Sequence, residues 1–318
     1  MKSVQAISFV VVGISLSFFA GCTPTPEMGL NLAGGSENVY KTVVETGKDY
    51  EYIQPSINKS LEKHSGNRIE MTFAQNIESL DNEGTATAVI TIQSLKYFVT
   101  SPEGAVIDFD SEREADKKNA LSKLIGQSYK IKIAKNGKVS ILDASAIRKV
   151  VKKGSAMKNA RTILSGDQII KRHQVLALVD SAQGPVKVGD SWTSLASSPV
   201  GALKAKTFEK TYQVEQIKSE KGQQIAIISM NAIPSSKRLG DMPEDEPVVG
   251  VMAAMFDEQD SFTGRLIINL TNGQILEYNE SLDTVWFAAE SPEDQKSDKG
   301  PDRLTIGFTH VYSIEKID

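Results

Sequence analysis

The sequence predicts an α+β fold rich in β-structure, in which two similar halves of long antiparallel strands form curved sheets or half-barrels with helices packed against them. Three observations predict it. Apolar and β-branched residues alternate with polar ones over long segments, two of these segments turn at Asn136-Gly137 and Asn272-Gly273, and one central stretch changes to helical spacing. Alternation with period two indicates strands, and Asn-Gly between alternating arms indicates a hairpin.

The chain opens with Lys2, an apolar run over residues 6–19, and the letters LSFFAGC at residues 16–22. The run is too short to span a bilayer and has the layout of a secretory signal. It resembles a bacterial lipoprotein signal peptide, although Phe19 stands where that pattern usually has Leu. The resemblance implies that residues 1–21 are removed and that Cys22 is acylated. The alternative is an ordinary signal peptide that is cut nearby, with Cys22 incidental.

Cys22 is the only cysteine, so the body contains no disulfide. The letters TPTPEMG at residues 23–29 and AGGS at residues 33–36 are rich in Pro and Gly. We therefore expect residues 22–38 to form a flexible tether between lipid and body. The body then divides into a first half with a helical segment, residues 39–182, and a second β-rich half, residues 183–318.

In the first half, residues 68–100 predict two long strands joined by a turn at residues 80–84, and residues 105–109 a short strand. Residues 112–123 form a polar run of helical character that meets Gly126. Residues 129–141 predict a hairpin whose two turn residues, Asn136 and Gly137, both take positive φ.

From residue 144 to about 182 the apolar residues recur at helical spacing, with a break at Ser165-Gly166. We expect one helix over residues 146–164 and a second one after it. The first carries a basic set with no acid nearby: Arg148, Lys149, Lys152, Lys153, Lys158 and Arg161. This set could rest on anionic headgroups, or it could be the solvated outer face of a helix that covers a sheet.

The second half predicts a strand pair around a turn at residues 220–222, an acidic loop at residues 240–247, a hairpin at residues 265–278 and a final strand. In the final strand Ile306, Phe308, Tyr312 and Ile314 share a face with His310. The two Asn-Gly turns are 136 residues apart. Similarity at a fixed offset indicates a duplication; the alternative is that long antiparallel sheets share turn chemistry by chance.

Three segments carry a wider resemblance: AVIDFDS at residues 105–111, the hairpin at residues 129–139, and PVKVGDSW at residues 185–192. Together they resemble an uncharacterised family of exported bacterial proteins, many of them lipoproteins, classed as a domain of unknown function. The resemblance covers most of the chain after the signal peptide. It implies no activity and no catalytic residues.

The sequence offers no recognisable catalytic or metal site. His64, His173 and His310 are far apart and lack metal-ligand spacing, and no nucleophile elbow or phosphate loop is present. Asp190 and Ser191 fit a turn that enters a strand, with Trp192 in the core. The acids at residues 244–246 fit a solvated loop better than a calcium site. We expect no cofactor and no metal, and we assign no catalytic or ligand-binding residues.

The formal net charge of −4 argues against nucleic acid as a partner. We therefore expect a non-enzymatic lipoprotein of the cell envelope, anchored to a membrane through acylated Cys22 and facing the periplasm or the exterior. Its curved sheets would bind an apolar ligand or a partner protein of the envelope. The alternative is a structural or assembly factor without a ligand pocket, and an enzyme ranks third.

Overall fold

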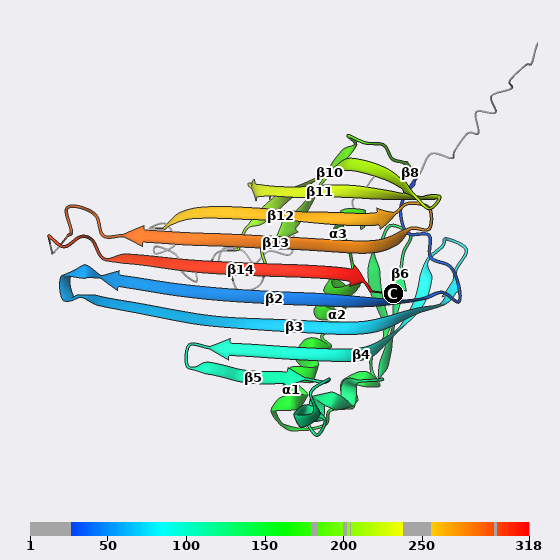
Figure 1. Ribbon diagram of the computed structural model, residues 1–318, viewed down its shortest axis with the longest axis horizontal. Coiled ribbons are helices and arrows are strands. Elements are labelled where there is room, and N and C mark those ends of the chain that lie inside the picture. Colours follow the sequence, from blue (N-terminus) through cyan, green and yellow to red (C-terminus); the bar gives the residue numbers. More distant parts are fainter. Residues whose placement is uncertain are drawn as a thin grey trace, which may run out of the picture.

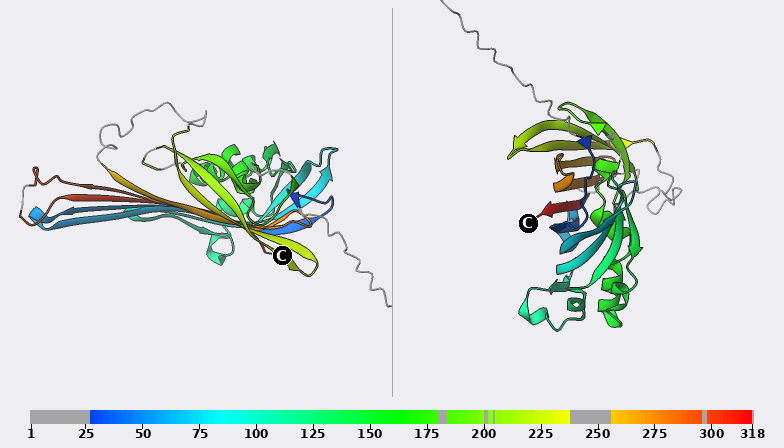
Figure 2. Two further views of the ribbon diagram at one scale, coloured as in Figure 1. Left: turned by 90° about the horizontal axis from the view of Figure 1, so that it is seen from above. Right: turned by 90° about the vertical axis from the view of Figure 1, so that its right-hand side faces the viewer.

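The computed structural model describes residues 27–179, 184–199, 202–203, 205–237, 256–295 and 298–317. In these ranges twelve strands form one antiparallel sheet, and short helices lie on its concave face (Figures 1 and 2). The predicted β-rich α+β fold with helices packed on curved sheet structure is confirmed. Cys22 and the acidic loop at residues 240–247 lie outside the described residues.

The first half of the chain forms one side of the sheet, and its bounds are β2 Glu37–Gln54, β3 Lys59–Leu80, β4 Ala86–Ser101, β5 Gly104–Asp110, β6 Ser128–Ile133 and β7 Val139–Asp143. The second half forms the other side, with β9 Ser191–Ser197, β10 Thr207–Glu220, β11 Gln223–Ser235, β12 Asp257–Asn269, β13 Gln274–Ala289 and β14 Arg303–Lys316. The strand order is β7-β6-β4-β3-β2-β14-β13-β12-β11-β10-β9, and β5 pairs with β4.

The two halves join where β2 pairs with β14 along nearly their whole length. They therefore contribute to one continuous sheet and do not form two separate ones. In the described chain each half winds outward from this central pair, and neighbouring strands are also neighbours in sequence except for β4 and β6, between which β5 intervenes. The internal duplication remains an interpretation of the sequence.

Alternation along the strands places apolar side chains on the concave face. On β3, Ile69, Met71 and Phe73 are buried, and on β4 the residues that face them include Ile92 and Leu95. The buried positions on β4 change parity between these two, because β4 has an extra residue opposite Thr72 and Phe73. Such a bulge bends a strand and increases its twist, which fits the curvature of the sheet.

The predicted hairpins exist, but their turns differ from the predicted type. At residues 134–138 Gly137 alone has a positive φ, +82°, and its N–H donates to the carbonyl oxygen of Ala134 at 2.8 Å. The prediction of positive φ at Asn136 is wrong, because a longer loop with one left-handed residue closes this hairpin. The two-residue turn with two positive φ angles instead joins β10 to β11, at Lys221 (+50°) and Gly222 (+79°).

The helices are shorter than the sequence predicts. The bounds are α1 Gly154–Ile163, α2 Gly166–His173 and α3 Leu176–Val179. The helix expected from residue 146 begins only at Gly154, whose φ of +77° breaks the right-handed path, and a 3₁₀ turn at Ile147–Lys149 precedes it. The break at Ser165-Gly166 is confirmed, because Ser165 caps α2 by accepting from the N–H of Gln168.

The polar run at residues 112–123 is not a regular helix. It forms two 3₁₀ turns, Glu114–Asp116 and Ala120–Leu124, and a third one joins β2 to β3 at Pro55–Ile57. Asp116 accepts from the N–H of Asp110 at 3.0 Å, and Asn119 accepts from the N–H of Leu121 at 3.0 Å. Such local side-chain bonds compete with helical backbone bonds.

Residues 27–38 pack against the body, so the prediction of a flexible tether is wrong for this part of residues 22–38. The strand β1 Glu27–Met28 pairs with β8 Gly184–Pro185. Met28 and Leu30 are buried, and the N–H of Leu30 donates to the carbonyl oxygen of Lys135 at 2.8 Å. These apolar side chains lie over one end of the sheet, where both halves meet.

Among the described residues, no helix combines the length and the hydropathy that crossing a bilayer requires.

Candidate functional site on the concave face

The concave face continues beyond the helices. In Figure 1 the left-hand ends of β2, β3, β13 and β14 extend past α1, α2 and α3, and Figure 2 shows that these described helices cover only the other part of that face. The side chains on the extended part that face the same way as the core are largely apolar. They form what we call the apolar strip: Tyr50, Tyr52, Leu61, Trp286, Leu304 and Ile306.

Five members of the apolar strip are half-buried, and Trp286 is buried. The opposite face of the same strands is mostly polar, with Asp49 bound to His64 at 2.7 Å and Arg68 bound to Glu45. Val285 and Phe287 are exceptions, exposed at 42% and 38%. The alternation of apolar and polar side chains, which is typical of a strand that packs on a core, therefore continues where no described helix covers the concave face.

Two lysines form ion pairs that cross the concave face between strands that are not neighbours. Lys210 on β10 binds Glu280 on β13, with 2.5 Å between Nζ and Oε1. Lys206, just before β10, binds Glu258 and Asp260 on β12 at 2.7 and 2.5 Å. The lysine side chains are only 2% and 12% exposed. Both lysines reach over at least one intervening strand, which the curvature of the sheet makes possible.

Aromatic side chains surround these ion pairs. Lys210 lies over the ring of Phe262 at 4.6 Å, and Tyr278 donates its hydroxyl hydrogen to Glu280. The indole N–H of Trp286 donates to Glu258 at 2.5 Å. Buried ion pairs gain enough attraction to offset their desolvation only when further hydrogen bonds satisfy the charged atoms, and these aromatic donors supply them.

Gly264 lies between Met230 and Glu280 in the register of the sheet. A Cβ atom there would lie 2.5 Å from the carbonyl oxygen of Asn279 and 2.9 Å from Cε of Met230. Because Gly264 has no side chain, the side chain of Glu280 can pass over this position.

One row of side chains across the concave face carries polar groups toward both ends. We call these groups the polar row: Ser194 and Lys210 on one side and His310, Thr46 and Asn67 on the other, with the apolar Ala232, Phe262 and Leu282 between them. His310, Thr46 and Asn67 are consecutive members of this row on β14, β2 and β3. The buried atoms Nδ1 of His310 and Oδ1 of Asn67 have no hydrogen-bond partner in the described chain.

Burial lowers the pKa of His310 to about 4. The charge of Glu280 acts in the opposite direction, and the charges of Lys171 and Lys210 lower the pKa further. The imidazole is therefore neutral near pH 7, and a neutral imidazole can donate or accept one hydrogen bond at Nδ1.

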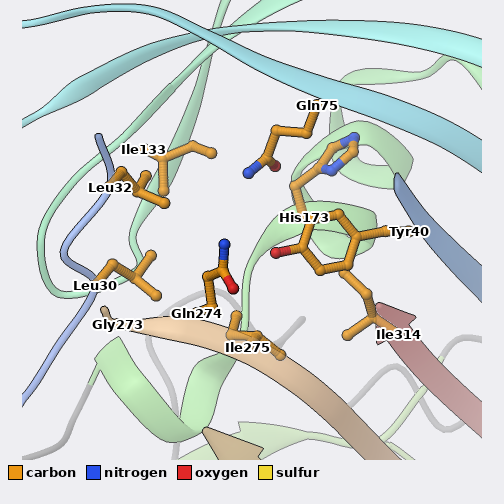
Figure 3. Close-up of a pocket in the computed structure, with 10 residues that line it drawn as sticks. All are labelled: Leu30, Leu32, Tyr40, Gln75, Ile133, His173, Gly273, Gln274, Ile275 and Ile314. Carbon is orange, nitrogen blue, oxygen red and sulfur yellow. The ribbon is translucent and has the colours of Figure 1, made fainter. Parts of the chain in front are cut away.

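A small cavity lies under the N-terminal segment, at the end of the sheet opposite the apolar strip. It measures about 20 Å³ and is lined by apolar side chains together with Tyr40, Gln75, His173 and Gln274. Figure 3 shows the amides of both glutamines and the hydroxyl of Tyr40 directed into it. This volume holds about one water molecule, so an acyl chain does not fit there.

The structure does not bring the three histidines together. His64 is exposed on the convex face, and His173 is buried beside Tyr129, whose hydroxyl lies 2.6 Å from Nε2. The turn at Asp190 and Ser191 enters β9 as predicted, with Asp190 accepting from the N–H of Lys187. Trp192 stacks on Tyr212 at 5.5 Å and packs against the core.

The basic residues expected on one helix are distributed over separate elements. Arg148 and Lys149 lie in the 3₁₀ turn, Lys152 and Lys153 precede α1, and Lys158 and Arg161 lie on it. Arg148 donates from Nε to the carbonyl oxygen of Leu164 at 2.8 Å. A continuous basic helix over residues 146–164 is therefore absent.

Sequence reasoning missed the lysine pairs. Lys206 and Lys210 occupy every second position with Phe208 and Tyr212, so the alternation that predicted β10 also places both lysines on the core face. A charged residue at a core-facing position requires a partner. The sequence therefore indicates that both lysines have partners, but which acids these are depends on the curvature of the sheet.

A family model described as "Family of unknown function (DUF6263)" matches residues 83–275, more than half of the chain. The protein belongs to the DUF6263 family. The matched range runs from the turn after β3 to the start of β13 and includes Lys206, Lys210 and Gly264. Asn67, Glu280 and His310 of this DUF6263 protein lie outside it. No curated protein matches the sequence.

Three solved structures are similar to this DUF6263 protein at low levels. Lipovitellin, from a study of its lipid–protein interactions, has a TM-score of 0.39 at 11% identity, and the match covers 90% of this chain but only 25% of lipovitellin. DynF from the dynemicin biosynthesis pathway of Micromonospora chersina has a TM-score of 0.16 at 7% identity and coverages of 97% and 91%. A DUF1329 family protein from Desulfovibrio piger has a TM-score of 0.15 at 7% identity and coverages of 85% and 84%.

The chain thus spans a quarter of the lipovitellin chain it matches. None of the three TM-scores reaches 0.5, so these similarities give no information on what the DUF6263 protein binds.

Proposed function

We propose that this DUF6263 protein is a non-enzymatic lipoprotein of the cell envelope, held at a membrane by acylated Cys22, and that its apolar strip binds an apolar ligand. The observation that carries the proposal is the persistence of apolar, core-facing alternation on a part of the concave face that no described helix covers. An uncovered apolar patch bordered by polar residues marks an interaction site.

The curvature favours a small ligand over a flat protein surface, because ligand sites are concave and mostly apolar with few polar groups. The apolar strip supplies the apolar surface, and the ion pairs beside it link strands across the concave face. The predicted anchor at Cys22 would hold this surface beside a membrane, which is a source of apolar molecules.

The two tryptophans provide a direct test, because Trp286 lies in the apolar strip and Trp192 lies against α3, where its indole N–H donates to the carbonyl oxygen of Ala177 at 2.9 Å. The whole chain carrying Cys22→Ser, and therefore unacylated, is used. Adding Trp192→Phe leaves Trp286 as its only tryptophan. Chain-brominated methyl stearate, a neutral quencher that acts only at short range, should then reduce its fluorescence.

The matched control is Trp286→Phe in the same background, which leaves Trp192 in the helix-covered part. We expect little quenching there. Equal quenching of both tryptophans, or none of either, would contradict ligand binding at the apolar strip. Crosslinking of the strip to an envelope protein, without any quenching, would favour a protein partner instead.

A further inference from the structure

His310, Thr46 and Asn67 of the polar row lie where the part of the concave face that the described helices cover meets the part that no described helix covers. Tyr312, two residues from His310 on the same face, contacts α2 by donating to the carbonyl oxygen of Arg172 at 3.0 Å. On the other side of His310, Phe308 lies between it and Ile306, a member of the apolar strip. A ligand on the strip would therefore place one end against His310, Thr46 and Asn67.

Two buried polar atoms at this place have no hydrogen-bond partner among the described residues, Nδ1 of His310 and Oδ1 of Asn67. Buried polar groups in folded proteins are nearly always hydrogen-bonded, and an unpaired one reduces stability. Two such groups on strands that flank Thr46 point to a polar group from outside the chain. The amide of Asn67 can present either its oxygen or its nitrogen by a flip.

The charges around this place are unbalanced. Lys48 and Lys63 lie on the same concave face, next in register to Phe308 and Tyr50, and both are exposed. In the described chain neither forms an ion pair, whereas Glu258, Asp260 and Glu280 on this face are bound to Lys206 and Lys210. Asp302, at the far end of the sheet, accepts from Tyr52 and Gln54.

We propose that His310, Thr46 and Asn67, with Lys48 beside them, form a subsite for the carboxylate of a long-chain fatty acid whose chain lies along the apolar strip. The proposal rests on the proposed function, since the strip must hold the chain. The carboxylate accepts hydrogen bonds from the imidazole N–H of His310, the hydroxyl of Thr46 and the amide of Asn67, and Lys48 supplies the opposite charge.

The charged groups around His310 determine how a bound carboxylate would change its pKa. Lys171 and Lys210 disfavour the protonated imidazole, whereas Glu280 favours it. A carboxylate bound at Nδ1 favours it as well. Binding should therefore raise the pKa of His310 from about 4 toward its ordinary value.

The test compares ligands that differ only at the head. The whole chain with Cys22→Ser is loaded with the neutral fluorescent probe N-phenyl-naphthylamine, which is then displaced by palmitate, palmityl alcohol or methyl palmitate at concentrations at which each ligand stays dissolved. Because charge-assisted hydrogen bonds are stronger than neutral ones, we expect palmitate to bind about tenfold more tightly than the alcohol or the ester.

Two variants should remove this preference while leaving the affinity for methyl palmitate nearly unchanged: His310→Leu and Lys48→Met. The control is Lys59→Met, which removes the same charge at the tip of β3, far from the polar row. Lys59→Met should keep the tenfold preference. Magnetic resonance of the His310 ring should show its pKa rising when palmitate, but not methyl palmitate, is added.

The outcomes separate this inference from the proposed function. If all three ligands displace the probe equally, the carboxylate subsite is overturned and the apolar strip remains a binding surface. Tighter binding of the alcohol would also overturn it. If none displaces the probe, both proposals fail. The three ligands are compared on the protein whose polar row is unchanged. The test therefore still decides the question if the His310 or Lys48 variant does not fold.

Discussion

The hydroxyl of Tyr312 on β14 donates to the backbone carbonyl oxygen of Arg172 at 3.0 Å and thereby fastens the end of α2 to a central strand of the sheet. The two residues are 140 positions apart in sequence. Tyr312 is buried, and Arg172 is buried as well. The position of α2 sets where the covered part of the concave face ends, so this bond helps to define the candidate site.

Replacing Tyr312 with Phe should loosen α2. The substitution leaves the carbonyl oxygen of Arg172 without its partner, which costs about 1–3 kcal/mol. Amide hydrogen exchange in Gly166–His173 should accelerate more than exchange in β3. The control is Tyr52→Phe, which removes a bond of 3.0 Å to Asp302 at the far end of the sheet. Unchanged exchange in α2 of the Tyr312→Phe protein would contradict this role.

Gly273 allows the N-terminal segment to cross the end of the sheet. A Cβ atom at Gly273 would overlap the backbone nitrogen of Asn31 and lie 2.7 Å from the carbonyl carbon of Leu30, and the φ of Gly273 is +64°. Gly273→Ala should therefore displace residues 29–31 and lower the free energy of unfolding by several kcal/mol, more than the left-handed backbone alone explains.

Gly84→Ala is the matched control for this prediction. Gly84 has a φ of +80°, and a Cβ atom there would meet no other atom within 4 Å. This variant should lose only the backbone cost of about 1 kcal/mol. Urea unfolding of both variants measures the difference, and equal losses would show that the close approach to Asn31 has no energetic consequence.

Breaking the crossing ion pair should destabilise the protein strongly. Lys210→Met keeps the packing on Phe262 but leaves Glu280, which is 12% exposed, without its cation. An uncompensated buried charge costs about 3–5 kcal/mol. The free energy of unfolding should fall by this amount, and the added substitution Glu280→Gln should restore much of it.

The comparison for Lys210 is an ion pair on the surface. Lys130 and Glu78 form a pair of 2.8 Å with side chains 45% and 41% exposed. Exposed pairs contribute about 0–1 kcal/mol, so Lys130→Met should change the unfolding free energy little. If Lys210→Met were as mild as Lys130→Met, the burial of the Lys210–Glu280 pair would have no energetic consequence.

Local patterns in the sequence predict most of the strands, because alternation depends only on neighbouring residues. The central pairing of β2 with β14 could not be predicted in this way, since it joins the two ends of the body. The extra residue in β4 could not be predicted either. It shifts by one position the side chains that face the core after Ile92, and the residue types along the strand give no sign of this shift.

The candidate site is non-local for the same reason. The final strand was predicted with Phe308, His310 and Tyr312 on one face, and the structure confirms that face. The neighbours of His310 in the row, Thr46 and Asn67, come from the other end of the chain, so only the assembled sheet places them together. The helix expected from residue 146 fails at a single residue, Gly154, whose backbone angle the helical spacing does not reveal.

Acid should destabilise the protein below about pH 6.5. Burial lowers the pKa of His310 to about 4, and burial with the charge of Arg172 lowers that of His173 well below its ordinary value. Between these values and 6.5 the unfolded chain binds protons that the folded chain does not, so stability rises with pH across this window and falls as acid is added.

For His310 the loss between pH 8 and pH 5 should be about 2 kcal/mol. Urea unfolding at the two pH values measures it, with His310→Gln as the variant that removes this contribution. The matched control is His64→Gln, on the exposed convex face, which leaves the contribution of His310 in place. A His310→Gln protein with the same pH dependence as the parent would show that the neutral imidazole does not matter for folding.

Replacing Cys22 with Ser should release the protein from membranes. The reason is chemical, because serine offers no thiol for acylation, and several acyl chains together anchor a protein firmly where one does not. Fractionation of cells should find the Cys22→Ser protein in the soluble fraction and the parent in the membrane fraction. The control is Ser36→Ala, which changes a hydroxyl in the folded N-terminal segment that donates to the carbonyl oxygen of Ala33 at 2.6 Å. It should leave membrane retention unchanged, whereas retention of the Cys22→Ser protein would refute the lipid anchor.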